Sequence, residues 1–358
     1  MTFRAPRLAL VGTGGWGRNL ARTLGTMPEA EVRWLCDLDP RTLRVAAPMC
    51  PQAAVTTSLD DVLADPMVEA VLVATPAVTH HAIGRRVLES GRDLYVEKPM
   101  ALDVGHGIDL LRLAQANDRV LMVGHLLEYH PAVLALRDAV ADGSLGRIRT
   151  IVAQRLNLGT VRSDENAMWS LAPHDVSAIL FLLGEMPTDV SARGLSCLDR
   201  GVEDVAFVTL RFGEHAIAQI HSSWLDPCKT RTMTVVGTRR MAVFDDLEPV
   251  EKLRFHDKHA ETLPSPGGVA GPVVLHSGAV VAPALETIEP LRAELAHFID
   301  CVRTRATPTS DGHDGLRVLR VLEAAQRSLA AGGAPMKPRA IPAPRARGGA
   351  PALANHDD

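Results

Sequence analysis

The segment that decides the fold is Leu8-Ala-Leu-Val-Gly12-Thr-Gly14-Gly-Trp-Gly17, in which a short apolar strand runs directly into glycines with G-x-G-x-x-G spacing. Gly12 permits the tight turn out of the strand, Gly14 lets the backbone approach a pyrophosphate, and Gly17 lets the next helix pack closely. The free N–H groups and the positive dipole end of that helix face the phosphates, so no basic side chain is needed. The segment predicts a dinucleotide site, and the alternative is an ordinary glycine-rich turn.

An acid after the second strand indicates which dinucleotide is bound. The apolar run at 32–36 ends in Asp37, where a Rossmann unit places the acid that binds the adenine-ribose hydroxyls. A carboxylate there repels the 2′-phosphate of NADP, so we expect NAD, although Arg41 and Arg44 are near enough to soften the preference. The alternative for Asp37 is a solvated acid at a strand end.

The bulk composition is that of an ordinary globular protein. The chain has 358 residues, more than a single hydrophobic core usually organises, so two domains are expected. Its net charge of −4 argues against a nucleic-acid binder, and no apolar run approaches the roughly 18 to 20 residues of a membrane helix. The N-terminus lacks a secretory signal, and the five cysteines and the histidines show no metal-ligand spacing. We therefore expect a cytoplasmic protein without a metal or membrane contact.

The order of predicted elements indicates an α/β fold with two domains. In the first third, strands at 7–11, 32–36, 70–74, 93–96 and 120–124 alternate with helices at 15–27, 41–49, 79–90 and 104–117, which predicts a doubly wound parallel sheet. Later segments at 149–156, 190–197, 204–212, 215–224 and 230–237 alternate with period two, which predicts a large open, mainly antiparallel sheet. Further helices are expected at 131–142, 173–183, 290–303 and 315–329, and a long loop at 263–284.

These patterns divide the chain into three parts. We expect a Rossmann domain at 1–124 and an α/β domain at 125–333. Residues 334–358 are rich in Pro, Ala, Gly and Arg and nearly lack bulky apolar groups, which predicts a disordered tail.

A second chemical signal ends the strand at 93–96, in the run Glu97-Lys98-Pro99. The carboxyl end of a Rossmann strand lies where ligands bind in open α/β sheets, beside the nicotinamide end of a dinucleotide. A lysine there polarises a hydroxyl or carbonyl oxygen, and its pKa falls when it is partly buried. The alternative is a surface lysine after a strand.

His174 is the candidate base. Ser170 and His174 stand four positions apart, so on a helix they address the same ligand. Pro173 suits the first turn of a helix and would direct His174 outward. Imidazole, with an ordinary pKa of about 6.5, can take a proton from an alcohol at neutral pH. The alternative is a core or surface histidine.

Taken together, the chain resembles the Gfo/Idh/MocA oxidoreductase family over about residues 5 to 330, on five elements in the family's order: Gly12-x-Gly14-x-x-Gly17, Asp37, Ala74-Thr75-Pro76-x-x-x-His80, Glu97-Lys98-Pro99 and His174-Asp175. The resemblance implies NAD(P) and a small carbohydrate between a Rossmann domain and an α/β domain that often mediates oligomerisation, here as a homodimer or homotetramer. It implies that the cofactor contacts are Gly12, Thr13, Gly14, Gly15, Trp16, Gly17, Asp37, Thr75, Pro76, His80, Glu97 and Lys98.

Within the family, the runs at 129–131, 155–159 and 164–175 resemble the branch that oxidises C3 of UDP-N-acetylglucosaminuronate. That branch implies substrate contacts from Lys98, Tyr129, Asn157, Arg162, Asn166, Ser170 and His174. Many members carry Asp where this chain has Ser170. The departure raises the importance of Lys98, either as the group that stabilises the oxyanion or as the base itself.

Three functions are compatible with these residues. The leading hypothesis is NAD-dependent oxidation of a ring secondary alcohol of a sugar or sugar nucleotide, with Lys98 and His174 as catalytic residues. The second is the same chemistry, or the reduction of a keto-sugar, on a cyclitol or aminoglycoside sugar of a secondary-metabolite pathway. The third is a redox sensor that binds NAD without turnover.

Overall fold

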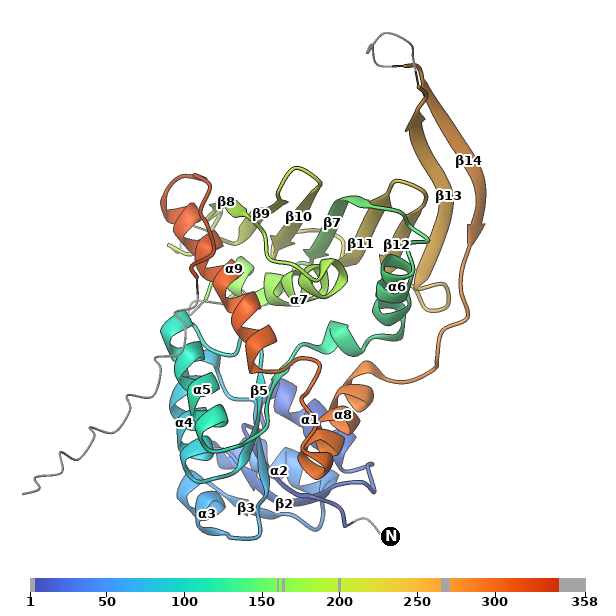
Figure 1. Ribbon diagram of the computed structural model, residues 1–358. Coiled ribbons are helices and arrows are strands. Elements are labelled where there is room, and N and C mark those ends of the chain that lie inside the picture. The colour runs from blue at the N-terminus through green and yellow to red at the C-terminus, as the bar shows by residue number, and fades with distance from the viewer. Residues whose placement is uncertain (1–3, 160, 163–164, 199–200, 265–270, 341–358) are drawn as a thin grey trace, which may run out of the picture.

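The computed structural model describes residues 4–340 except 160, 163–164, 199–200 and 265–270, and it contains two large sheets (Figure 1). The first sheet has the order β3-β2-β1-β4-β5-β6, and all of its pairs are parallel. Its strands are β1 (Arg7–Val11), β2 (Glu31–Cys36), β3 (Ala54–Thr56), β4 (Ala70–Val73), β5 (Asp93–Glu97) and β6 (Leu121–Gly124).

Helical connections return the chain between these parallel strands, as crossover units require. They are α1 (Gly15–Leu24), α2 (Pro40–Ala46), η1 (Ala47–Met49), α3 (Leu59–Ala64), η2 (Ala77–Thr79), α4 (His80–Glu89) and α5 (Val104–Ala116). Every residue of β4 is buried, as expected for a strand covered on both faces. The strand order reverses between β1 and β4, so their carboxyl ends form the switch point where such sheets bind ligands.

The second sheet has the order β14-β13-β12-β11-β7-β10-β9-β8 and is antiparallel except for the pair β7 and β10. Its strands are β7 (Ile148–Leu156), β8 (Asp189–Leu195), β9 (Val205–Phe212), β10 (Ala216–Ser223), β11 (Thr230–Gly237), β12 (Met241–Asp245), β13 (Leu253–Thr262) and β14 (Val273–Val281). Its helices are η3 (Leu126–Tyr129), α6 (Pro131–Ala141), α7 (Ala167–Leu183), α8 (Pro290–Thr304) and α9 (Gly312–Ala330). The predicted fold class, a Rossmann sheet followed by a mainly antiparallel sheet, is confirmed.

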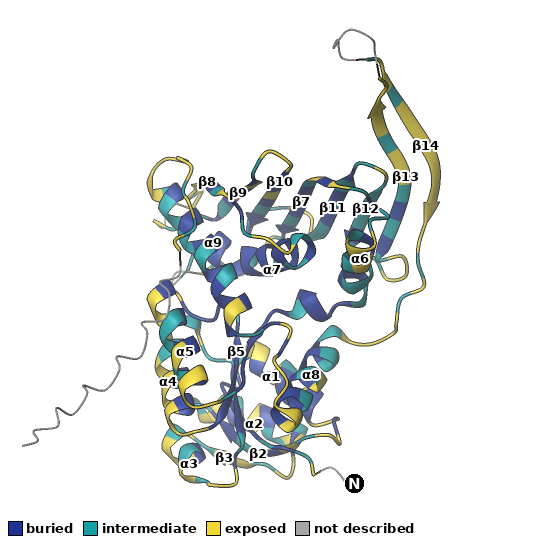
Figure 2. Ribbon diagram, viewed as in Figure 1, coloured by how far each residue is buried: buried dark blue, intermediate teal, exposed yellow. Residues whose placement is uncertain are grey.

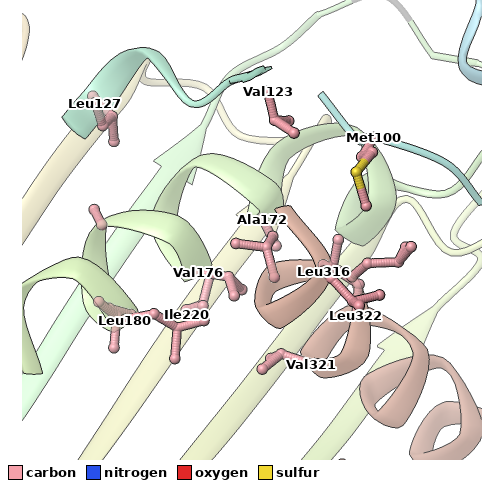
Figure 3. Packing of buried hydrophobic residues seen from close by; sticks show 14 of the residues in the cluster. Met100, Val123, Leu127, Ala172, Val176, Leu180, Ile220, Leu316, Val321 and Leu322 are labelled. Carbon is pink, nitrogen blue, oxygen red and sulfur yellow. The ribbon is translucent and has the colours of Figure 1, made fainter. Parts of the chain in front are cut away.

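The helices of the C-terminal half join the two sheets. α7 packs on β7, β9 and β10, and α9 packs on α7, α5 and β8. α8 returns to the first sheet and packs on α1 and η3. Figure 3 shows the apolar seam between α7, α9 and the carboxyl edge of the first sheet, formed in part by Ala172, Val176, Leu180, Leu316, Leu322, Met100 and Val123. This seam fixes the carboxyl edge of the first sheet against α7.

Two local expectations are wrong. The segment 263–284 contains β14, which pairs with β13 in a hairpin that projects from the body (Figure 1). Most of β14 is exposed (Figure 2), so it lacks the alternation of a half-buried strand. Met336 exchanges two backbone hydrogen bonds with Val190, so residues 334–340 are ordered, and 341–358 lie outside the described residues. Among the described helices, none has the length and apolar character to span a membrane.

Candidate active site

The glycine turn has the geometry of a pyrophosphate cradle. Gly12 has φ +94°, and a Cβ there would lie 2.6 Å from the carbonyl carbon of Ala74. A Cβ at Gly17 would lie 2.0 Å from the carbonyl oxygen of Gly12, so α1 can pack here only without a side chain. A Cβ at Gly14 or Gly15 would meet no described atom within 4 Å. The N-terminus of α1 is therefore open to an anion, which fits the phosphates of a dinucleotide.

Gly17→Ala tests this cradle. Because the new methyl group meets backbone, we expect the free energy of unfolding to fall by about 1–3 kcal/mol and NADH binding to weaken by about tenfold. Thermal unfolding and NADH fluorescence titration measure the two effects. Gly15→Ala adds the same methyl group in open space and is the control for stability. Wild-type NADH affinity in Gly17→Ala would contradict the assignment of the turn.

The side chain of Asp37, the acid expected to bind the adenine ribose, is hydrogen-bonded to the glycine turn. Its Oδ2 accepts hydrogen bonds from the Thr13 backbone N at 2.6 Å and the Thr13 Oγ1 at 3.2 Å, and its Oδ1 accepts from Asp39 N at 2.9 Å. Thr13 is fully buried and orients Asp37, and its expected contact with the cofactor stays a prediction. Arg41 pairs with Asp39 at 2.9 Å. The cation expected to soften the preference for NAD is thus directed to another acid.

The loop after β4 lies beside this turn. The Oγ1 of Thr75 is 2.7 Å from the Oγ1 of Thr79, and Pro76 is exposed. His80 is buried, with its ring nitrogens 2.8 Å from the carbonyl oxygens of Thr75 and Pro99. The ring therefore joins the loop after β4 to the loop after β5, and the expected cofactor contact of His80 stays a prediction.

Lys98 follows β5 and reaches α7. Its peptide bond to Pro99 is cis, and its Nζ donates a hydrogen bond to the carbonyl oxygen of Ser170 at 2.9 Å. Burial is the main cause that lowers the pKa of Lys98, and the charges of Arg155 and Arg162 lower it further. The neighbouring carboxylates Glu97 and Glu165 oppose this change. A lysine with a lowered pKa can exchange a proton more readily than a solvated one.

The helix that carries His174 begins earlier than expected. α7 starts at Ala167, and Asn166 caps it by accepting a hydrogen bond from Trp169 N at 3.0 Å. Pro173 therefore lies inside the helix, where it cannot donate to the carbonyl of Trp169. Asn166 is buried, and its Nδ2 donates to Glu203 and Gln326. Its expected contact with substrate stays a prediction.

Ser170, His174 and Lys98 come together on one face of α7. Ser170 and His174 are one helical turn apart, and the Lys98 ammonium is bound at Ser170. Burial lowers the pKa of His174 well below its usual value, and the positive charges of Lys98, Arg155 and Arg231 lower it further. The imidazole is consequently neutral at neutral pH. It can accept a proton from a hydroxyl group that also faces Lys98.

A buried ion pair behind His174 was missed by the sequence analysis. Arg155 of β7 donates to both carboxylate oxygens of Asp175, from Nε at 3.0 Å and from Nη2 at 3.1 Å. Both side chains are under 10% exposed, at 7% and 3%. The pair ties α7 to β7 at the residue next to His174. The sequence signal was present, since both residues lie in the runs that carry the resemblance, but no spacing rule joins positions on separate elements.

The remaining expected substrate residues are distributed unevenly. Tyr129 is buried, and its hydroxyl lies 3.0 Å from the Oγ of Ser310. Its expected contact with substrate stays a prediction. Asn157 is partly exposed directly after β7. Arg162 is exposed, pairs with Glu165 at 3.1 Å, and acts on the charge of Lys98. Asn157 and Arg162 therefore stay predictions for the mouth of the site.

Folding also assembles side chains that sequence spacing did not connect. His125, Glu128 and Asp314 are buried together, with the Nδ1 of His125 2.8 Å from Asp314 and 3.3 Å from Glu128. The two carboxyl groups raise the pKa of His125 to about 10 despite its burial. The short contacts surround one N–H group, as hydrogen bonds to an imidazolium do. A second group, His259, Glu261 and His276, lies on the hairpin of β13 and β14.

Comparisons with known proteins identify the family of the chain. Residues 6–125 match the oxidoreductase family with an NAD-binding Rossmann fold, and residues 133–243 match the GFO/IDH/MocA C-terminal domain. UDP-N-acetylglucosamine 3-dehydrogenase of Acidithiobacillus ferrooxidans is 29% identical over 316 residues, which cover 87% of this chain and 94% of that protein. Inositol 2-dehydrogenase of Rhizobium meliloti is 22% identical over 90% of this chain and 97% of its own length.

A solved structure covers nearly the whole chain. The crystal structure of GenD2 from gentamicin A biosynthesis, in complex with NAD, superposes with a TM-score of 0.78 at 28% identity and covers 95% of this chain and 98% of its own. The two family matches span more than half of the sequence and correspond to the two sheets. The chain belongs to the Gfo/Idh/MocA family of oxidoreductases.

Proposed function

We propose that this oxidoreductase uses NAD to oxidise a ring secondary alcohol, at a C3-type position, of a sugar nucleotide. The observation that carries the proposal is the placement of the Lys98 ammonium one helical turn from the neutral His174, at the carboxyl edge of the Rossmann sheet. The relative from Acidithiobacillus ferrooxidans, a UDP-N-acetylglucosamine 3-dehydrogenase, supports the substrate class.

The reaction divides between the cofactor and two side chains. NAD, when bound, supplies the carbon that accepts the hydride. His174 takes the hydroxyl proton, and Lys98 stabilises the negative charge that develops on the substrate oxygen. Because the pKa of His174 is lowered, its basic form persists below the usual pKa of about 6.5. We therefore expect kcat/KM to fall on the acid side only at a pH below about 6.5.

A substrate panel tests the proposal. We expect NADH formation with UDP-linked amino sugars, and loss of activity when the UDP group is removed. Free sugars and myo-inositol serve as comparison alcohols. NADH binding without turnover of any alcohol or ketone would contradict the proposal and would favour a redox sensor.

A second substrate class is favoured by the likeness to GenD2, whose structure comes from gentamicin A biosynthesis. In that case the ring alcohol belongs to an aminoglycoside sugar or a cyclitol, and the same two side chains act. Turnover of pseudo-disaccharides with no turnover of UDP-sugars would select this class, in either the oxidising or the reducing direction.

Asp37→Asn tests the preference for NAD over NADP. Removing the charge leaves an amide whose oxygen can still accept from the backbone N of Thr13, whereas its NH2 group then faces the backbone N of Asp39, so one local hydrogen bond is lost with the charge. We expect the ratio of kcat/KM for NAD to that for NADP to fall by about tenfold, the loss of one charged hydrogen bond. Asp138→Asn removes the same charge from an exposed acid of α6 and is the control. An unchanged ratio in Asp37→Asn would contradict the role of this acid.

We propose further that the protein is a homodimer or homotetramer through the outer face of the second sheet. Val152, Phe207 and Ile217 come from β7, β9 and β10 and are each at least 40% exposed. They alternate with buried neighbours that face α7, so they lie on the opposite face of the sheet. Light scattering of the wild type and of Phe207→Glu tests this assembly.

A further inference from the structure

A row of hydrogen-bonded side chains runs beside Lys98 from the glycine turn to α8. The indole Nε1 of Trp16 donates to the Oε1 of Glu97. The hydroxyl oxygen of Tyr95 lies 3.1 Å from that same Oε1 and 3.1 Å from the Oε2 of Glu294. Tyr95, Glu97 and Glu294 are buried, whereas Trp16 is 40% exposed. The row therefore joins a helix of the C-terminal half to the turn that receives the cofactor.

If Glu97 and Glu294 were both ionised, the contacts of Tyr95 with them would lack one hydrogen. A phenol has one hydrogen, so Tyr95 can donate to Glu97 or to Glu294 but not to both. The second contact is a hydrogen bond only if one carboxyl group is protonated and donates to the phenol oxygen. Two ionised carboxylates on one buried hydroxyl would also repel each other.

The surroundings decide which group carries that proton. Glu97 accepts a hydrogen bond from the indole of Trp16 and another, at 3.3 Å, from the backbone N of Lys98. It also faces the positive charge of the Lys98 side chain. The Oε1 of Glu294 has no hydrogen-bond partner among the described residues. Burial raises the pKa of Glu294 well above its usual value, and repulsion from Glu97 adds to this. Burial raises the pKa of Glu97 too, but the hydrogen bond from Trp16 and the charge of Lys98 oppose that change. The contacts therefore favour the proton on Glu294 and the charge on Glu97.

We propose that Glu294 is a positioning residue whose carboxyl group donates to Tyr95, so that Tyr95 donates to Glu97 and holds it, ionised, between Trp16 and Lys98. The catalytic part of this inference rests on the proposed role of Lys98. The row sets the direction of each hydrogen bond between α8 and the glycine turn. Loss of the Glu294 proton would leave two anions competing for one phenol hydrogen.

Other charged groups face Glu294 from the elements packed around α8. Glu97 of β5 and Glu128 of η3 raise its pKa, and His125, which follows β6, lowers it. Arg22 of α1 pairs with Glu289 at the start of α8. Burial is the largest influence, so the sum raises the pKa of Glu294 and favours its protonated form.

The experiment compares Glu294→Gln, Glu294→Leu and Tyr95→Phe in the full chain. We expect the activity of the wild type to decline at alkaline pH, where Glu294 loses its proton. Glutamine can donate to Tyr95 but cannot ionise, so Glu294→Gln should keep activity within about twofold at neutral pH and should not show this alkaline decline. Glu294→Leu and Tyr95→Phe break the row and should lower kcat by about tenfold, the loss of a hydrogen bond to a charged group. Asp300→Asn, at a partly exposed acid on the same helix, is the control.

A second readout does not depend on turnover. NADH affinity, by calorimetry, and the fluorescence of Trp16, as the difference from Trp16→Phe, are measured across pH. The wild type should change both at alkaline pH, and Glu294→Gln should change neither. An unaltered alkaline response in Glu294→Gln, or wild-type kcat and pH profiles in Tyr95→Phe, would overturn the inference. If no alcohol is oxidised, the proposed function fails, and the NADH-binding and fluorescence data still test the role of Glu294.

Discussion

Lys98→Met is expected to lower kcat by about 10³-fold and to leave NADH affinity nearly unchanged. The ammonium is held by the carbonyl of Ser170 rather than by the glycine turn, so its removal leaves the phosphate cradle intact. Methionine has a side chain of similar length and flexibility, so the substitution mainly removes the positive charge and the exchangeable proton. Steady-state NADH formation and NADH fluorescence titration measure the two quantities.

Two companion variants separate the roles of Lys98 and His174. Lys98→Arg keeps a positive charge that cannot be given up at neutral pH, so partial activity would identify Lys98 as the group that stabilises the oxyanion. His174→Ala should lose a comparable factor, and the double variant should lose less than the product of the single losses, because the groups act on one hydroxyl. Near-normal activity of Lys98→Met and His174→Ala would contradict the assignment of both.

Sequence patterns could identify the candidate residues whose role depends only on the backbone at the end of one strand. Gly12 and Gly17 act through turn geometry, and Lys98 follows its strand directly, so each could be placed from neighbouring residues. The hydrogen-bond partners of Tyr129 and Asn166 could not be predicted, because they are distant in the chain. Ser310 engages the first, and Glu203 and Gln326 engage the second. A polar residue that is satisfied at long range looks the same in sequence as one that is free.

Two of the strands that the sequence analysis missed, β3 and β14, have a related physical cause. β3 has three residues, too few to show a period, and β14 is largely exposed on both faces, so neither carries the alternation of a half-buried strand. α8 was predicted nearly correctly as a helix, at 290–303 against Pro290–Thr304. Its return to the first sheet, and with it the row that ends at Glu294, depends on tertiary packing that periodicity does not encode.

Asp175→Ala is expected to reduce the free energy of unfolding by about 3–5 kcal/mol, because it leaves the buried guanidinium of Arg155 without its counter-charge. Urea unfolding measures the loss. Asp138→Ala breaks an exposed pair with Arg137 and is the control, with an expected loss below about 1 kcal/mol. Equal losses in the two variants would show that the pair behind His174 is no more than a surface contact.

Replacing both members of the buried pair separates stability from catalysis. Arg155→Met with Asp175→Leu fills the space with apolar groups, so stability should return to within about 1–2 kcal/mol of the wild type. Activity should not return fully, because Arg155 is one of the charges that lower the pKa of His174. Without it the pKa of His174 rises, and the acid limb of kcat/KM moves to higher pH. An acid limb that stays in place would show that burial alone keeps His174 neutral.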